Sequence, residues 1–188
     1  MRFGICTAID NIEKVEKMGF DYLEANASGV AALSEEDFQK TLELVKNAKI
    51  GCECFNVLFP KTISVVGPDK NAEEMEKYLH GVFSRIQKLG GTIVVFGSGK
   101  CRSFPEGMDF DEAFRQLVDS FRLVGKIAAE YGITIVIEPL NRAESNLINS
   151  VAEGALLRAI LDMPSVQGLA HGYHMFLEDE KLSDISRV

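Results

Sequence analysis

The sequence predicts an α/β protein in which parallel strands alternate with helices, in about six βα units. Short runs rich in β-branched and aromatic residues alternate with longer stretches whose apolar residues recur at helical spacing. Two of the runs, TIVVF and ITIVI, are almost continuously apolar, as is typical of strands buried on both faces of a parallel sheet. The expected strands are Arg2–Thr7, Asp21–Ala25, Gly51–Val57, Thr92–Gly97, Ile133–Glu138 and Val166–Ala170.

The stretches between these strands have helical spacing and recognisable ends. Gly19, Gly90-Gly91 and Gly132 follow periodic stretches and indicate helix ends. Ser34 and Ser150 are each followed three residues later by an acidic residue, which predicts capping boxes that open helices. The apolar helical sets run over Ile12–Met18, Phe38–Val45, Met75–Ile86 and Phe114–Ala128.

Polar residues at several strand ends favour a (β/α) TIM-barrel type of fold over an open doubly wound sheet. A barrel builds its site from the C-terminal ends of different strands, and no Gly-x-Gly-x-x-Gly turn follows the first strand. An eight-unit barrel usually takes about 250 residues, so we expect residues 1–188 to form a single incomplete barrel domain lacking the last two units. The final EDEKLSDISRV is expected to begin the sixth helix. The polar strand-end residues are Asn26, Asn56, Ser98, Glu138 and Asn141.

Composition excludes several classes of protein. Lys and Arg total 20 against 28 Asp and Glu, and the net charge of −8 argues against a nucleic-acid partner. No apolar run approaches the roughly 18 residues of a membrane span, and the first residues do not resemble a signal peptide. The cysteines at 6, 52, 54 and 101 are therefore expected to be reduced, with Cys52 and Cys54 on one face of the third strand as buried structural thiols. We expect a cytoplasmic protein without membrane contacts.

The segment IVIEPLNRAES carries the clearest candidate chemistry. Glu138 ends a buried strand, and Pro139 prevents that strand from continuing. Glu144 follows on the next loop beside Asn141 and Arg142. Two carboxylates with an amide and a guanidinium suit a polyhydroxylated, anionic or enediolate-like ligand. The alternative is a structural ion pair between Glu138 and Arg142.

Two further segments contain candidate site residues. In GLAHGYHMF, His171 and His174 directly follow the sixth strand and could point into one site, or could be ordinary loop histidines. His80 lies within a helical pattern and is expected to be solvated. In GSGKCR, Lys100 and Arg102 could approach a phosphate, although a glycine-containing βα turn is the simpler interpretation.

Three of these segments together resemble the sugar phosphate isomerase/epimerase family, the xylose isomerase-like TIM-barrel group that includes ketose 3-epimerases, hydroxypyruvate isomerases and inosose dehydratases. They are IVIEPLNRAESNLINSVAEG, VVFGSGKCRSFPEG and GLAHGYHMF. The resemblance covers essentially the whole chain, and the Glu-x-Leu-Asn-Arg element with a second Glu six residues after the first is most similar to the ketose 3-epimerase branch. It implies an isomerase of carbohydrate metabolism that acts on a sugar or sugar phosphate and uses a divalent metal such as Mn²⁺, Co²⁺, Mg²⁺ or Zn²⁺.

The resemblance also implies roles for individual residues. Glu138 matches a metal ligand that exchanges a proton with the substrate carbon, while Glu144 and His174 match substrate-binding residues. Asn141 and Arg142 border the same substrate site. His171 stands where the family has an aspartate metal ligand, which keeps a ligand but removes a negative charge.

The family's remaining histidine and glutamate ligands, on the seventh and eighth strands, have no counterpart in the sequence. We therefore expect weak metal binding, little or no activity from this chain alone, and a homo-oligomer formed through the open edge of the barrel. The alternative is a catalytically dead relative that binds sugar or a partner. An apurinic-site endonuclease of the same superfamily is disfavoured, because it needs more histidines and a surface that attracts phosphate.

Overall fold

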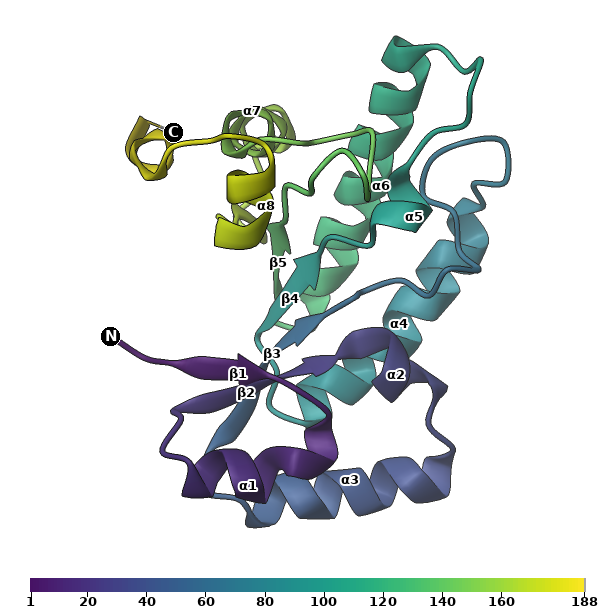
Figure 1. Ribbon diagram of the computed structural model, residues 1–188. Coiled ribbons are helices and arrows are strands. Elements are labelled where there is room, and N and C mark those ends of the chain that lie inside the picture. Colours follow the sequence, from purple (N-terminus) through teal and green to yellow (C-terminus); the bar gives the residue numbers. More distant parts are fainter. Residues whose placement is uncertain (188) are drawn as a thin grey trace.

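The structure, a computed structural model that describes residues 1–187, contains one parallel six-stranded sheet (Figure 1). The strands follow one another in the sheet in chain order, and every neighbouring pair is parallel. All six strands expected from the sequence are present, with ends that differ by at most two residues. They are β1 (Gly4–Cys6), β2 (Tyr22–Asn26), β3 (Gly51–Asn56), β4 (Ile93–Phe96), β5 (Thr134–Ile137) and β6 (Val166–Gly168).

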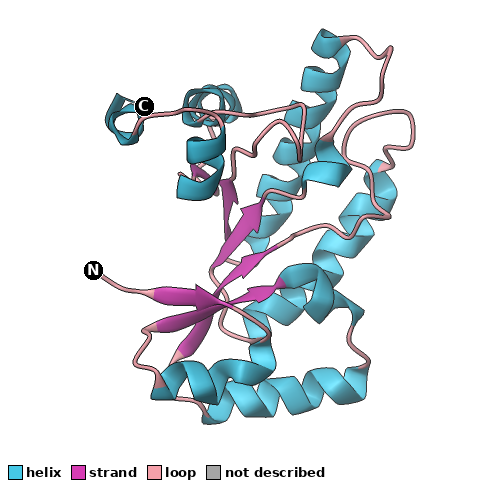
Figure 2. Ribbon diagram, in the orientation of Figure 1, coloured by secondary structure: helices cyan, strands magenta, loops and turns pink. Residues whose placement is uncertain are grey.

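Helices connect the strands, as parallel pairing requires. The longest helices lie along one side of the sheet, as Figure 2 shows. The α-helices are α1 (Ile12–Lys17), α2 (Ala27–Ala32), α3 (Glu35–Asn47), α4 (Ala72–Lys88), α5 (Gly99–Arg102), α6 (Phe110–Glu130), α7 (Val151–Leu161) and α8 (Gly172–Leu177), with 3₁₀ turns at Ile9–Asn11 and Leu182–Arg187. None of the helices in residues 1–187 has the length and apolarity to cross a membrane.

The sheet is open, with β1 at one edge and β6 at the other. Strands in sequential order with helices outside are the arrangement of a TIM barrel, and six of them do not close the ring. The expectation of an incomplete barrel is therefore confirmed.

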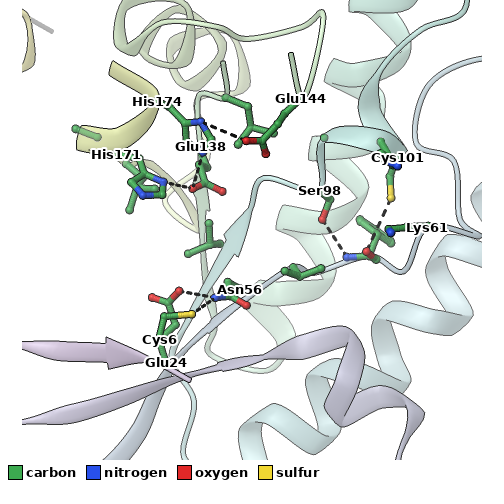
Figure 3. Close-up of a pocket in the computed structure, with 18 of the residues that line it drawn as sticks. Cys6, Glu24, Asn56, Lys61, Ser98, Cys101, Glu138, Glu144, His171 and His174 are labelled. Carbon is green, nitrogen blue, oxygen red and sulfur yellow. Dashed lines mark hydrogen bonds and ion pairs between the residues drawn. The ribbon is translucent and has the colours of Figure 1, made fainter. Parts of the chain in front are cut away.

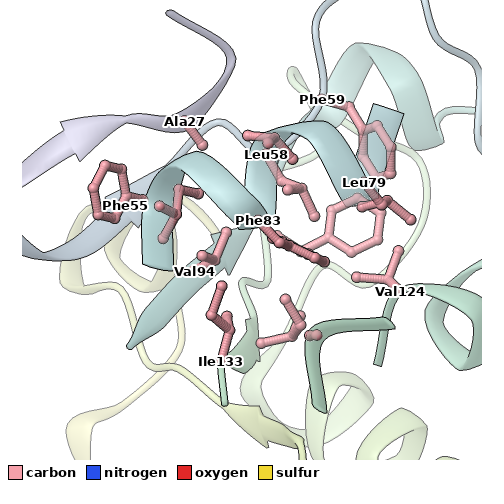
Figure 4. Close-up of a cluster of buried hydrophobic side chains, with 14 of the residues drawn as sticks. Ala27, Phe55, Leu58, Phe59, Leu79, Phe83, Val94, Val124 and Ile133 are labelled. Carbon is pink, nitrogen blue, oxygen red and sulfur yellow. The ribbon is translucent and has the colours of Figure 1, made fainter. Parts of the chain in front are cut away.

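The core lies between the sheet and the helices (Figure 4). Alternate residues of β4 and β5 point to this side, and Val94, Phe96 and Ile137 are fully buried there. Phe83 of α4 and Phe121 of α6 supply aromatic rings from the helices. Because side chains alternate along a strand, the intervening residues point to the opposite, concave face, where a site can form.

Both predicted caps open helices. Ser34 Oγ accepts a hydrogen bond from the Asp37 N–H at the start of α3, and Ser150 Oγ accepts one from the Glu153 N–H at the start of α7. The Glu153 carboxylate accepts from the N–H of Asn149 rather than that of Ser150.

The two neighbouring cysteines of β3 do not share a face, contrary to the expectation. The β2–β3 register shifts between Tyr22 and Glu24, so β3 contains one extra residue at that point. Cys52 consequently packs in the helix-side core, whereas Cys54 pairs with Glu24. Burial raises the pKa of Cys52 to about 12 and that of Cys54 to about 11, so both are inert thiols. All four cysteines are free.

Three smaller expectations are also wrong. Met18, expected to belong to the first apolar helical set, is exposed and lies one residue past the end of α1. His80 is half-buried and bonded through Nδ1 to the Tyr131 hydroxyl at 3.0 Å, instead of being solvated. The last segment forms the 3₁₀ turn Leu182–Arg187, where an α-helix was expected.

A fully buried arginine joins the ends of β4 and β5 to the loop that follows. Arg102 is 0% exposed. Its guanidinium donates to the backbone carbonyl oxygens of Phe96 (3.1 Å), Glu138 (2.7 Å) and Ile148 (3.3 Å). Burial lowers the pKa of Arg102 to about 10, while the nearby Glu138 charge opposes that shift, so the side chain stays charged at neutral pH. The structure therefore supports the structural interpretation of the GSGKCR turn over phosphate binding by this arginine.

We predict that Arg102→Met lowers the free energy of unfolding by about 3 kcal/mol or more, because it leaves buried carbonyl groups without donors. Urea unfolding followed by circular dichroism measures the change. The matched control is Arg115→Met on the exposed face of α6, which should change stability by no more than about 0.5 kcal/mol. A loss below about 1 kcal/mol for Arg102→Met would contradict the structural role.

Candidate active site

A cavity of about 1040 Å³ opens on the concave side of the sheet, at the C-terminal ends of the strands. Its size suits a small-molecule ligand. Residues from β1, β2, β3 and the loops after β4, β5 and β6 line it, among them Cys6, Glu24, Asn56, Ser98, Glu138, Glu144, His171 and His174. Figure 3 shows these side chains from several strand ends facing one space.

Glu138 reaches the cavity because the chain stops being a strand at that point. Ile137 is the last residue of β5 and is buried in the core, and Glu138 follows it on the opposite face. Gly97 makes room for the carboxylate, since a Cβ at Gly97 would collide with Glu138 Oε2. The Glu138 side chain is only 15% exposed, so its carboxylate is held rather than free in solvent.

Both histidines contact this carboxylate. His171 Nδ1 lies 2.7 Å from Glu138 Oε1, and His174 Nε2 lies 3.8 Å from the same oxygen. His171 is the N-cap of α8 and His174 lies in its first turn, so a spacing of three residues brings both rings to one side. The structure thus brings together three residues singled out from the sequence.

The tautomer of His174 follows from its neighbours. The Asn141 backbone N–H lies 3.2 Å from His174 Nδ1, and Asn141 Nδ2 lies 2.9 Å from the same atom. Because both Asn141 groups are donors, Nδ1 must accept, and the neutral ring carries its proton on Nε2. Burial lowers the pKa of His174, which favours that neutral ring. His174 therefore presents an N–H donor toward Glu138 and the cavity.

Glu144 and Arg142 occupy different surroundings. Asn141 Nδ2 also donates to Glu144 Oε1 at 2.9 Å, so the buried Asn141 holds both Glu144 and His174. Arg142 is exposed and forms an ion pair with Glu178, whose carboxylate also accepts the Arg142 backbone N–H. The structure thus places the Arg142 guanidinium against Glu178 rather than on the cavity wall. It does not form the ion pair with Glu138 that the sequence left open.

Glu138, His171 and His174 form a group that could hold a metal ion, with one ligand atom from each within 4.8 Å of the others. Metal–ligand bonds of about 2 Å require ligand atoms within about 4 Å of each other, so the Glu138–His171 pair fits as it stands. A cation between Glu138 and His171 would replace the hydrogen bond that joins them. His174 fits less well as a ligand, since its Nε2 carries the proton.

The sequence did not single out Glu24, although it lines the same cavity. Asn56 Nδ2 donates to Glu24 Oε1 at 2.8 Å and to Cys6 Sγ at 2.8 Å. The alternation of apolar and polar residues along β2 could have indicated Glu24. Leu23 and Ala25 are buried in the core, so the residue between them must face the cavity.

A parallel barrel-type sheet with an acid and two imidazoles at its strand ends defines a protein of the TIM-barrel class, with a small-molecule site. The model of the family described as xylose isomerase-like TIM barrel matches residues 12–187. The chain therefore belongs to this family.

Curated relatives include sugar epimerases. The chain is 27% identical over 185 residues to the D-psicose 3-epimerase of Ruminiclostridium cellulolyticum, covering 94% of this chain and 61% of that protein. It is 32% identical over 79 residues to the 3-dehydro-D-guloside 4-epimerase of Escherichia coli, covering 42% of this chain and 29% of the relative. The chain thus spans about three fifths of the length of the first relative.

Solved structures show the same fold. D-psicose 3-epimerase with D-tagatose from Clostridium cellulolyticum superposes with a TM-score of 0.83 at 24% identity, over 100% of this chain and 69% of that one. The 3-keto-D-glucoside 4-epimerase of E. coli superposes with a TM-score of 0.82 at 18% identity, over 100% and 74%.

We predict a pH dependence of stability from His174, measured without added divalent metal. Because burial lowers the pKa of the folded imidazole, the unfolded chain binds the proton more readily. Stability is therefore lost as the pH falls below the unfolded value of about 6.5, until the folded ring is protonated too. Urea unfolding between about pH 7.5 and 5 should show this loss of stability. The His174→Gln variant should lose less stability over the same pH range, because it lacks the imidazole. An unchanged pH slope in the variant would contradict the prediction.

Proposed function

We propose that this chain is a sugar isomerase- or epimerase-like protein whose site exchanges a proton at the carbon next to a ketose carbonyl. The observation that carries the proposal is the position of Glu138, whose Oε1 lies 2.7 Å from His171 Nδ1 and 3.8 Å from His174 Nε2 on the wall of a ligand-sized cavity. A carboxylate held between imidazoles is suited to general acid/base chemistry. Family membership and the epimerase relatives support the same class of reaction.

In this proposal Glu138 accepts the proton from the carbon next to the carbonyl, which gives an enediolate, and returns a proton to it. His174 donates its Nε2–H to a substrate oxygen, where negative charge develops, while Asn141 fixes the ring. Glu144, held by the same Asn141, accepts a hydrogen bond from a substrate hydroxyl group. Arg142 borders the site and, by pairing with Glu178, attaches the loop after β5 to the end of α8.

The residues that would hold a divalent cation are Glu138 and His171. When bound, the cation would lower the pKa of the carbon acid by polarising the substrate oxygens. We propose weak binding, because an imidazole at 171 contributes no negative charge to hold a hard cation.

We predict that the purified 188-residue chain epimerises free ketohexoses at or near background, since Glu138 is the only carboxylate that its described residues place against both imidazoles. Inversion at carbon needs an acid/base group on each face, and one such group is worth roughly 10²–10⁴-fold in rate. The assay uses Mn²⁺ or Co²⁺ with a ketohexose panel and polarimetric or chromatographic detection. Robust turnover that Glu138→Gln abolishes would refute the inactivity and would indicate that a second subunit completes the site.

The proposed site itself is tested by binding. Titration calorimetry with the same sugars in the presence of Mn²⁺ should show saturable binding that Glu138→Gln weakens. Glu43→Gln, on the exposed surface of α3, removes the same charge elsewhere and should leave binding unchanged. Absence of ketose binding to the unmodified chain would overturn the proposal, and binding that Glu138→Gln leaves unchanged would favour the catalytically dead, sugar-binding alternative. The cytoplasmic location stays a prediction.

We also propose that the chain forms a homo-oligomer through the open edge of the sheet. Two edge strands, β1 and β6, present unpaired backbone groups. Apolar side chains near them in the sequence are exposed, with Phe3 just before β1 at 62% and Phe176, on the helix that follows β6, at 79%. Exposed apolar surface of this kind marks interaction sites.

We predict that light scattering at tens of micromolar gives a mass of two or more chains, and that Phe176→Ser shifts it toward the monomer. Met18→Ser removes an exposed apolar side chain at the end of α1 and should leave the mass unchanged. A monomer for the unmodified chain would refute this proposal.

A further inference from the structure

The cavity has a second polar wall, formed by Cys6 of β1, Glu24 of β2 and Asn56 of β3. We refer to these three residues as the acceptor wall. Figure 3 shows it below Glu138 and His171, across the open space of the cavity. None of the three residues has a part in the proton transfer proposed above.

The two N–H groups of Asn56 are the strongest hydrogen-bond donors of the acceptor wall, and both already donate to residues of the wall itself. The Asn56 amide has two N–H groups, one of which donates to Cys6 Sγ and the other to Glu24 Oε1, each at 2.8 Å. Asn56 Oδ1 has no hydrogen-bond donor among residues 1–187, and the Glu24 carboxylate keeps lone pairs beyond its bonds with Asn56 and Cys6. The free capacity of the wall therefore consists of acceptors.

The charges around the wall act in the same direction. Desolvation raises the pKa of the Cys6 thiol; the hydrogen bond from Asn56 opposes this shift, while the charge and hydrogen bond of Glu24 and the charge of Glu138 add to it. Lys61 and Lys100 also line the cavity, and Figure 3 places Lys61 beside Cys101, away from the acceptor wall. An anionic group of a ligand would be drawn to the lysines and repelled by Glu24.

We propose that the acceptor wall is a substrate subsite that binds hydroxyl groups of the sugar, with Glu24 and Asn56 accepting hydrogen bonds from them. Hydroxyl groups fit because they bring protons and no negative charge to a wall that offers a carboxylate and an amide oxygen. The inference deepens the proposed function, on which it rests, by making Glu24 a specificity-determining residue. A site built to bind a hydroxyl also disfavours the analogue that lacks it, because its polar groups are then left unpaired.

The test combines a variant with deoxy sugars. Titration calorimetry in Mn²⁺ compares D-fructose with its 1-deoxy and 6-deoxy analogues, using the unmodified chain and Glu24→Gln. Glu24→Gln keeps the shape of the side chain and is expected to weaken D-fructose binding about tenfold. That penalty should shrink for the analogue that lacks the hydroxyl bound by the wall, which a simple loss of folding would not produce. Thermal unfolding checks that the variant is folded, and Glu43→Gln is the control for charge.

Each outcome decides between the two proposals. If Glu138→Gln weakens D-fructose binding while Glu24→Gln leaves it within twofold, the subsite is refuted and the proposed function stands. An equal penalty from Glu24→Gln for D-fructose and both deoxy analogues also refutes the subsite, because the effect is then indirect. If the unmodified chain binds none of the three sugars, both proposals fail.

Discussion

The site depends on one buried interaction, the guanidinium of Arg102 beneath the ends of β4 and β5. Removing an arginine from water is costly unless its donors are satisfied, and here the backbone carbonyl groups of three separate segments satisfy them. One of these carbonyls belongs to Glu138 itself, so the residue at the centre of the site is held through its main chain. Because the acceptors are backbone groups, the interaction fixes the path of the chain and leaves the Glu138 carboxylate directed into the cavity.

A second layer of contacts extends from this anchor to the imidazoles. Asn141 follows Glu138 by three residues, and it orients His174 through both its main chain and its side chain. Its side-chain N–H groups also reach Glu144, so one buried amide sets the positions of an acid and a base. The loop after β5 and helix α8 therefore act as a unit, which the Arg142–Glu178 pair reinforces at the surface.

The sequence predicted features that depend on local pattern. Apolar runs gave all six strands, and the positions of Glu138, His171 and His174 just past strand ends placed them on one side of the sheet. Features that depend on tertiary contacts were missed. The extra residue in β3 separates Cys52 from Cys54, and nothing in CEC signals a register shift. The burial of Arg102 was not predicted, because its acceptors come from residues up to 46 positions away.

The partnership of Glu138 with His171 sets the chemical character of the site. The resemblance implies an aspartate at position 171, and two carboxylates side by side repel each other until a cation lies between them. An imidazole instead forms a hydrogen bond with Glu138, with Nδ1 and Oε1 2.7 Å apart. The pair is therefore satisfied without a metal, and a cation must displace a proton to bind. Since the acceptor wall adds a further carboxylate across the cavity, proton donors from a ligand are favoured there. The Glu138–His171 pair thus disfavours retention of a tightly bound cation, and the acceptor wall favours recognition of hydroxyl groups over anionic groups.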